Sequence, residues 1–301
     1  MLHLFIINKH AGKSAAYEDI LSQLKPLNTP EKLIVECTKC PKDATDIARR
    51  YVKNSDEFVR IYACGGDGTF NEVLNGVYDL ENCAVASVPT GSGNDFIRSF
   101  DIPKEDFLSV EKLLNGREVE VDLLKCGDRI SGNSITIGYD CAVAKNVDKF
   151  KKKKFISASL AYKLSIFYCL INGRKHNFRI IADGRELKRD GTYLLSVSAK
   201  GKFYGGGIKC SPKADNRDGY IDFMAVKTVG VLKFVSLLPT FIKGAHIDNP
   251  KFDFVTHSKV KSVSYLSEKP FEIGIDGEII SVDKAEIELL PKAQKIILPI
   301  K

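Results

Sequence analysis

Short apolar runs alternate with helical patterns through the first 125 residues, and this alternation constrains the fold more than any other feature. Runs such as LHLFII (2–7) and FVRIYAC (58–64) have the length and composition of buried strands. Strands that alternate with helices form parallel β-α-β units, so we expect a three-layer α/β domain at the N-terminus. The expected strands are 2–7, 32–37, 58–64 and 83–88, and the expected helices are 15–24, 43–52 and 69–77.

The pattern changes after residue 118. Apolar or alternating runs now lie close together, separated by Gly, Asp or Asn, which is typical of an antiparallel β-sandwich. Helical stretches at 140–149, 157–171 and 231–241 interrupt these runs. We therefore expect an α/β domain over 1–122 and a β-sandwich domain over 123–285. Residues 286–301 are expected to return to the first domain.

Composition narrows the class of protein. Of 301 residues 44% are hydrophobic, 45 are basic and 38 are acidic, which gives a net charge of +7 and excludes a disordered or collagen-like chain. No run of about 18 uncharged apolar residues occurs, so no transmembrane helix is expected. The eight cysteines are interpreted as reduced thiols of a cytoplasmic protein.

A run of lysines, Lys149 and then 151–154, is the sharpest local charge feature. One interpretation is a solvated loop or helix end. The other is a surface for anionic phospholipid head groups, which attract basic residues by about 1 kcal/mol each. Nucleic acid is not an expected partner, because no aromatic and basic recognition pattern surrounds the run.

Three polar or glycine-rich loops follow expected strands of the first half. They are NKHAGKS (8–14), GGDGT (65–69) and PTGSGND (89–95). Glycine allows backbone amides to approach a ligand closely, and a helix N-terminus favours anions such as phosphate. A tight turn with a helix cap would explain one such loop. Three of them at the carboxyl edge of one parallel sheet indicate a ligand site.

Closely spaced carboxylates mark two turns of the second half. Asp215, Asp218 and Asp222 follow the segment YGGG (204–207), and Asp276 and Glu278 flank a glycine near the end of the chain. Hard oxygen ligands of this kind suit Mg²⁺ or Ca²⁺. Polar β-turns and a hairpin with Asp-Gly chemistry are the structural alternatives.

Taken together, these segments match one family. GGDGTFNEVLNG (65–76), PTGSGNDFIRSF (89–100), YGGGIKCSPKADNRDGYIDF (204–223) and IDGE (275–278) occur in this order. The chain resembles the diacylglycerol kinase catalytic-domain family of soluble lipid kinases, which includes bacterial diacylglycerol kinases and sphingosine kinase relatives. The resemblance implies an α/β nucleotide domain followed by a β-sandwich domain, with the ATP site in the cleft between them.

The resemblance also implies roles for individual residues. Asp218 would hold a structural Mg²⁺ with backbone oxygens near Asp215 and Tyr220, and Asp122 would join the Asp–water–Mg²⁺ network. Glu278 matches the proton acceptor, with Asp276 beside it, and Asp67 would engage catalytic Mg²⁺ or the ribose. The implied ATP contacts are Asn8, Lys9, His10, Ala11, Gly12, Thr38, Gly65, Gly66, Asp67, Gly68, Thr69, Phe70, Asn71, Ser92 and Asn94, with Lys9 standing where the family usually has proline.

The predicted activity is transfer of the γ-phosphoryl group of ATP to a lipid hydroxyl, with diacylglycerol giving phosphatidic acid. Alternatives are another lipid of sphingoid or phosphatidylglycerol type, a soluble acceptor such as NAD, or a non-catalytic nucleotide-binding protein. ATP and Mg²⁺ are the expected cofactors. The expected partner is a lipid at the inner membrane surface, reached transiently from the cytoplasm, and the resemblance also allows a homodimer.

Overall fold

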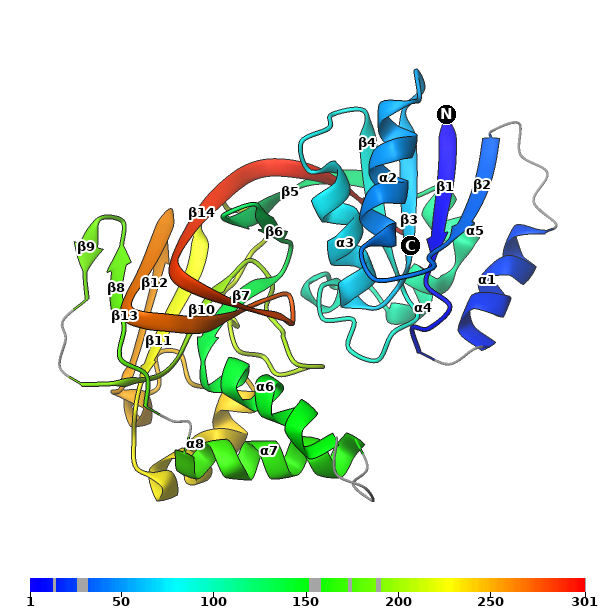
Figure 1. The fold of residues 1–301 in the computed structure, drawn as a ribbon. Helices are drawn as coiled ribbons and strands as arrows, with labels where there is room; N and C mark the ends of the chain where they lie inside the picture. Colours follow the sequence, from blue (N-terminus) through cyan, green and yellow to red (C-terminus); the bar gives the residue numbers. More distant parts are fainter. Residues whose placement is uncertain (13–14, 26–31, 152–157, 173–174, 188–190, 301) are drawn as a thin grey trace.

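The computed structural model describes residues 1–12, 15–25, 32–151, 158–172, 175–187 and 191–300. The chain forms two lobes, joined by β5 (Arg117–Cys126) and β14 (Glu278–Leu298), which run side by side between them (Figure 1). The first lobe is an α/β domain and the second is built on an antiparallel sheet, so the expected fold class is confirmed.

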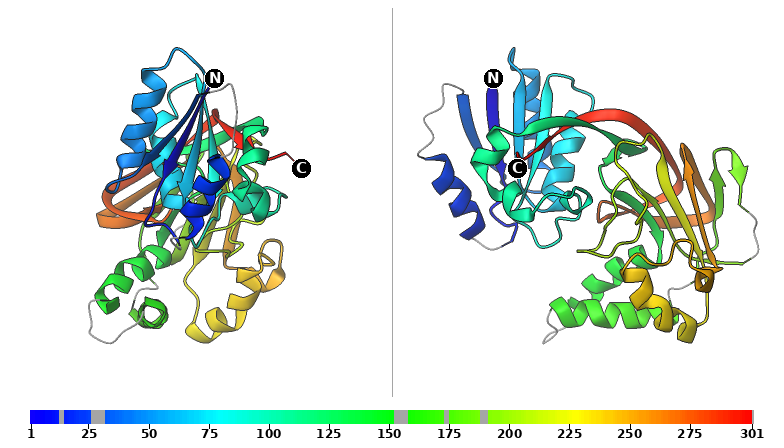
Figure 2. Two further views of the ribbon diagram at one scale, coloured as in Figure 1. Left: turned by 90° about the vertical axis from the view of Figure 1, so that its right-hand side faces the viewer. Right: turned by 180° about the vertical axis from the view of Figure 1, so that it is seen from behind.

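The N-terminal lobe contains four parallel strands in the order β2-β1-β3-β4. Helices α2 and α3 cover one face of this sheet and α1 lies on the other (Figure 2). All residues of β1, β3 and β4 are buried, as expected for strands that are covered on both faces. The elements are β1 (Leu2–Ile7), α1 (Ala15–Leu24), β2 (Lys32–Cys37), α2 (Asp43–Lys53), β3 (Val59–Gly65), α3 (Asp67–Val77), β4 (Cys83–Pro89), η1 (Ile97–Ser99), α4 (Lys104–Leu108) and α5 (Val110–Leu114).

The C-terminal lobe is an antiparallel arrangement in the order β12-β11-β10-β7-β13-β14. One apolar core, which includes Phe223 and Tyr265, lies within the sandwich, and a second, which includes Leu194 and Val226, lies against the helices. The elements are β6 (Arg129–Ser131), β7 (Ser134–Gly138), α6 (Tyr139–Lys151), α7 (Ala158–Asn172), β8 (Arg179–Ala182), β9 (Arg185–Glu186), β10 (Tyr193–Ala199), β11 (Ile221–Lys227), α8 (Val231–Ile242), η2 (Pro250–Phe252), β12 (Val255–Val260) and β13 (Ser262–Ile275).

Two strands connect the lobes. Strand β5 runs without interruption through residue 122, where the domain boundary was expected. Strand β14 pairs first with β13 and then with β5, and its Ile296 pairs in parallel with Val85 of β4. Both lobes are therefore parts of one continuous hydrogen-bonded sheet.

The three helices expected in the second half are confirmed as α6, α7 and α8, each within two residues of its expected bounds. The lysine run lies outside the described residues, since neither the side chains of Lys149 and Lys151 nor any part of 152–154 is described. Among the helices of the described part of the chain, none is both long and apolar enough to cross a membrane.

Candidate functional site

The three glycine-bearing loops of the first lobe come together at the carboxyl edge of its sheet. A Cβ atom on Gly91 would lie 2.4 Å from the Gly66 Cα, and one on Gly12 would lie 1.9 Å from the Thr90 carbonyl oxygen. Neither contact is sterically allowed, so these positions require glycine for the loops to pack. Gly12 also has a φ of +73°, which glycine adopts readily.

Asp67 fastens two of these loops together. Its carboxylate accepts hydrogen bonds from the backbone N–H groups of Asn94 (2.6 Å), Asp95 (2.7 Å) and Phe96 (3.3 Å). Since Asp67 is the first residue of α3, it joins the start of that helix to the loop after β4. The expectation that Asp67 engages Mg²⁺ or ribose stays a prediction, and the contacts observed for this carboxylate are with backbone.

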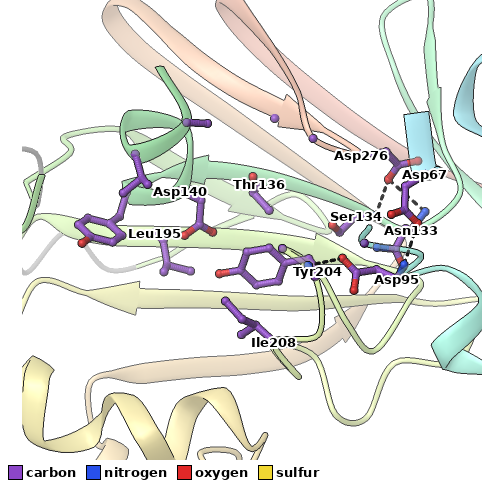
Figure 3. A pocket seen from close by; sticks show the side chains of 18 of the residues that line it. Asp67, Asp95, Asn133, Ser134, Thr136, Asp140, Leu195, Tyr204, Ile208 and Asp276 are labelled. Atoms are coloured by element: carbon purple, nitrogen blue, oxygen red, sulfur yellow. Dashed lines mark hydrogen bonds between the residues drawn. The ribbon is translucent and has the colours of Figure 1, made fainter. Parts of the chain in front are cut away.

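One cavity of about 910 Å³ extends from these loops into the second lobe. The loop end is lined by His10, Gly12, Gly66, Asp67, Ser92 and Asp95, and the far end by Val143, Leu194, Leu195, Val226, Phe234 and Phe241. Figure 3 shows the carboxylates of Asp67, Asp95 and Asp276 gathered at one end, with Asp140 and Leu195 farther along. The cavity is therefore polar at one end and apolar at the other.

The expected nucleotide contacts divide into two groups. His10, Ala11, Gly12, Gly66, Asp67, Gly68, Phe70 and Ser92 line the cavity, whereas Asn8, Lys9, Thr38, Gly65, Thr69, Asn71 and Asn94 lie outside its described lining. Several of the second group support the loops instead. The Asn8 amide donates to Thr69 Oγ1 (3.0 Å), and the Asn94 amide donates to the Gly91 carbonyl (2.6 Å). The Lys9 ammonium lies 5.7 Å from the centre of the Tyr17 ring.

Asp276 occupies the tight turn between β13 and β14, with a φ of +46°. Its carboxylate accepts hydrogen bonds from the Ser131 hydroxyl, from the N–H groups of residues 132, 133 and 134, and from the Asn71 amide (2.7 Å). Burial raises the pKa of this carboxyl, although the hydrogen-bond donors around it favour the charged form and act to lower the pKa. Because Asn71 belongs to α3, Asp276 also links the two lobes.

Glu278 lies apart from the other acids. Its side chain is 44% exposed and forms an ion pair with Arg129 of β6. Within the described lining of the cavity, Gly277 and Ile279 are present but Glu278 is not. Its implied role as proton acceptor stays a prediction, and this role would require the side chain to turn away from Arg129.

Sequence reasoning missed two acids of the cavity wall, the buried Asp95 and the partly buried Asp140. Asp95 Oδ2 accepts a hydrogen bond from the Gly206 N–H (2.7 Å). Its Oδ1 is buried without a hydrogen-bond partner among the described residues and forms a longer ion pair with the Arg98 Nε (3.5 Å). Burial raises the pKa of Asp95, and the nearby charge of Asp67 adds to the shift. Burial likewise raises the pKa of Asp140 to about 6. Asp95 stands in the quoted GND segment, which was a usable signal, whereas only folding places Asp140 in a cavity.

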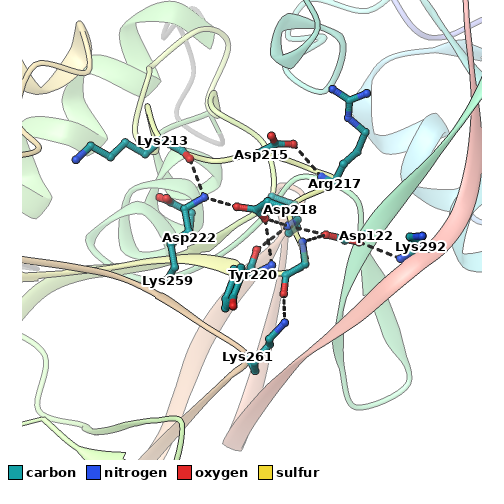
Figure 4. Close-up of polar contacts among 12 residues, drawn as sticks. Asp122, Lys213, Asp215, Arg217, Asp218, Tyr220, Asp222, Lys259, Lys261 and Lys292 are labelled. Atoms are coloured by element: carbon teal, nitrogen blue, oxygen red, sulfur yellow. Dashed lines mark hydrogen bonds and ion pairs between the residues drawn. The ribbon is translucent and has the colours of Figure 1, made fainter.

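The oxygens expected to hold a structural Mg²⁺ contact lysine ammonium groups instead. Figure 4 shows Asp122, Asp218 and Tyr220 close to one another. The Lys200 Nζ lies 2.9 Å from Asp122 Oδ2, 2.9 Å from Asp218 Oδ1 and 2.6 Å from the Tyr220 carbonyl oxygen. A divalent ion about 4 Å from that ammonium would meet a repulsion of about 8 kcal/mol at an effective dielectric constant of about 20.

The side chain of Asp215, also expected near this metal, accepts a hydrogen bond from the Arg217 N–H (2.9 Å). No cluster of three or more His, Cys, Asp or Glu suited to a metal occurs among the described residues. Because the ammonium groups of Lys200 and Lys259 pair with its carboxylates, this place does not fit a divalent cation.

Comparison with known families agrees with the two-lobed architecture. Residues 3–126 match the model of the diacylglycerol kinase catalytic domain. Residues 133–298 match the model of the YegS C-terminal NAD kinase β-sandwich-like domain. The two matches follow one another along the chain and cover most of it.

Individual relatives span most of the chain as well. A diacylglycerol kinase of Bacillus subtilis strain 168 is 29% identical over 264 residues, covering 87% of this chain and 84% of the relative. A diacylglycerol kinase of Mycobacterium tuberculosis is 26% identical over 246 residues, or 79% and 76% of the two chains. The crystal structure of a "putative diacylglycerol kinase" from Bacillus anthracis superimposes with a TM-score of 0.76 at 25% identity, covering 98% of this chain and 95% of that one. With both lobes matched in order and the fold shared, this chain belongs to the diacylglycerol kinase catalytic-domain family.

Proposed function

We propose that the protein is an ATP-dependent lipid kinase, which transfers the γ-phosphoryl group of ATP to the hydroxyl of diacylglycerol and so produces phosphatidic acid. The observation that carries the proposal is the single cavity with glycine-rich loops at one end and apolar side chains at the other. A phosphoryl donor and an acceptor with hydrocarbon chains would meet within it.

The polar end suits a nucleotide that brings its own counter-cation. Backbone amides of the Gly66 and Gly91 loops and the N-terminus of α3 favour phosphate oxygens. The described lining includes Asp67, Asp95, Asp140 and Asp276 but no lysine or arginine, and Arg98, which is not among the lining residues, is paired with Asp95. Mg²⁺ bound to the phosphates would supply the missing positive charge, as it does in phosphoryl transfer generally. The protein's own part is to position the reactants and keep water out.

The acceptor hydroxyl needs an oxygen that can orient it and accept its proton late in the reaction. Both oxygens of Asp276 and of Asp67 already accept hydrogen bonds. Asp95 Oδ1 is buried and has no hydrogen-bond partner among the described residues, and it lies 3.5 Å from the Arg98 Nε, with which it forms an ion pair. We therefore assign this positioning role first to Asp95. Glu278 is the second candidate, provided that it leaves Arg129. A turnover assay that compares Asp95→Asn with Glu278→Gln distinguishes these two candidates.

The apolar end favours hydrocarbon over a dinucleotide. Leu194, Val226 and Phe234 would contact acyl chains there, and a buried Leu or Phe contributes roughly 1.5–3 kcal/mol through desolvation. NAD would place a ribose or its charged pyrophosphate against these walls, in addition to the phosphates of ATP at the polar end. The lining offers those groups no lysine or arginine among the residues that the structure describes.

Helix α8 gives the apolar end a route to the membrane. Phe234, Leu237 and Phe241 of this helix line the cavity, whereas Leu232 is 87% exposed. Exposed apolar side chains next to an apolar cavity would insert among lipids, so that an acceptor could enter without crossing water. We propose this face of α8 as the membrane contact.

The test is transfer of radiolabelled phosphate from Mg-ATP to three acceptors: long-chain diacylglycerol in vesicles, a short-chain dispersed diacylglycerol, and NAD. We expect labelled phosphatidic acid from both lipids. Leu232→Asp should lower transfer to the vesicle substrate by at least about fivefold and leave the dispersed substrate nearly unchanged, because only membrane contact is lost. Val35→Asp, at an exposed apolar position of β2 in the other lobe, is the matched control. Labelling of NAD and of no lipid would overturn the proposal.

A further inference from the structure

Lys200 is a fully buried cation at the centre of a polar cluster between the lobes. Its side chain has an exposed fraction of 0%, and its three closest oxygens belong to Asp122, Asp218 and Tyr220, at 2.9, 2.9 and 2.6 Å. An ammonium group has three N–H donors, so its hydrogen-bonding capacity matches this set. The distances are those of charge-assisted hydrogen bonds, well above the 2.0–2.1 Å at which Mg²⁺ binds oxygen.

The partners of Lys200 tie together segments that are far apart in the sequence. Lys200 directly follows β10, and its own N–H donates to the Asn133 carbonyl (2.8 Å). Asp122 comes from β5, and it also accepts hydrogen bonds from the N–H groups of Gly219 (2.7 Å) and of Lys292 in β14 (2.9 Å). The cation therefore lies where both connecting strands meet the second lobe.

The charges of the cluster balance without a metal. Asp122 and Asp218 carry two negative charges, and the ammonium groups of Lys200 and Lys259 carry two positive ones. A divalent cation added here would leave a partly buried excess of two positive charges.

We infer that the Lys200 ammonium takes the place of the structural divalent cation that the family resemblance assigns to the Asp218 carboxylate and to backbone oxygens near Asp215 and Tyr220, with Asp122 in the surrounding network. The chain then carries its own cation between the lobes, and its folded state needs no Mg²⁺ at this place. Any requirement for Mg²⁺ is confined to the nucleotide. This inference concerns stability and does not depend on the proposed activity.

The experiment compares thermal unfolding of the nucleotide-free full chain in EDTA and in millimolar MgCl₂ at matched ionic strength. We expect the wild-type melting temperature to be the same in both. Lys200→Ala leaves two facing carboxylates without their buried cation and should melt roughly 6 °C or more lower in EDTA. Mg²⁺ should restore a large part of that loss, because the space and the oxygens then suit a metal. Lys259→Ala, which removes the 35% exposed lysine of the cluster, should show no such rescue.

A wild-type melting temperature that rises with Mg²⁺ in the absence of nucleotide would overturn the inference. So would a Lys200→Ala variant that is as stable as wild type or is not rescued by Mg²⁺. If this variant does not fold, titration of the wild-type protein with Mn²⁺, followed by electron paramagnetic resonance, decides the matter. We expect no nucleotide-independent site, and binding that Asp218→Asn abolishes would contradict us.

Discussion

Replacement of Asp67 by alanine tests how the site is held together. The carboxylate receives two short hydrogen bonds, from the N–H groups of Asn94 (2.6 Å) and Asp95 (2.7 Å), and a longer one from Phe96 (3.3 Å). All three donor residues are less than a tenth exposed. Alanine would leave these N–H groups buried without their acceptor.

The expected cost follows from these contacts. A hydrogen bond to a charged group contributes about 1.5–3 kcal/mol, so loss of the two short bonds should cost about 3 kcal/mol even if the longer one contributes nothing. For a lobe of this size that corresponds to a melting temperature lowered by roughly 6–12 °C. Asp67→Asn keeps one acceptor oxygen and should lose about half as much.

Urea unfolding followed by circular dichroism and tyrosine fluorescence measures this change, since the chain contains no tryptophan. Asp283→Ala removes an exposed carboxylate from β14 and should stay within about 0.5 kcal/mol of wild type. The reasoning is refuted if Asp67→Ala is as stable as this control. In that case its carboxylate is free to serve the nucleotide directly, and a loss of turnover in the variant would have a catalytic cause.

Further predictions concern pH, loop packing and Glu278. Asp140 has a folded-state pKa of about 6, above the value of about 3.9 for an unfolded chain. Its contribution to the free energy of unfolding is therefore fully present below about pH 3.9 and is lost as the pH rises through about 6. Asp140→Asn should therefore raise the free energy of unfolding by about 1 kcal/mol more near pH 8 than near pH 5, and an equal effect at both would contradict this assignment. Gly91→Ala places a Cβ 2.4 Å from the Gly66 Cα and should weaken Mg-ATP binding in calorimetry by about tenfold or more, since the loops must separate. Glu278→Ala should cost less than about 1 kcal/mol of stability, because its ion pair with Arg129 is exposed, so lost turnover with an unchanged melting curve would identify a direct role. Wild-type turnover would remove Glu278 from the mechanism.

Sequence patterns were sufficient to predict much of the first lobe. The apolar runs at 2–7 and 32–37 coincide with β1 and β2, and the loops that follow the strands meet at one edge. Parallel strands separated by helices allow few topologies, so their carboxyl ends must lie together. The helices of the second lobe were also predicted, because their apolar periodicity is visible in the sequence and does not depend on knowing the surface they pack against.

The roles of individual acids were less predictable. Asp67 was predicted to engage catalytic Mg²⁺ or the ribose, and the structure adds contacts that no sequence pattern indicated. Its carboxylate accepts hydrogen bonds from a loop whose position depends on β4. Glu278 and Asp276 are two residues apart, and yet one pairs with Arg129 at the surface while the other is surrounded by donors. These different surroundings depend on the positive φ of Asp276 and on the register of β13 with β14. Neither can be read from a sequence pattern.

The amino-acid sequence by itself determined the strands and helices of the α/β lobe, the glycine-rich loops at its edge and membership of the family, because these depend on local patterns with few three-dimensional solutions. Only the tertiary structure decided what fills the space between the lobes. The apolar end of the cavity is built from β10, β11, α6 and α8, and Lys200 lies against acids from β5 and the loop before β11. Burial and charge pairing depend on which distant segments meet, and that is a property of the packed chain.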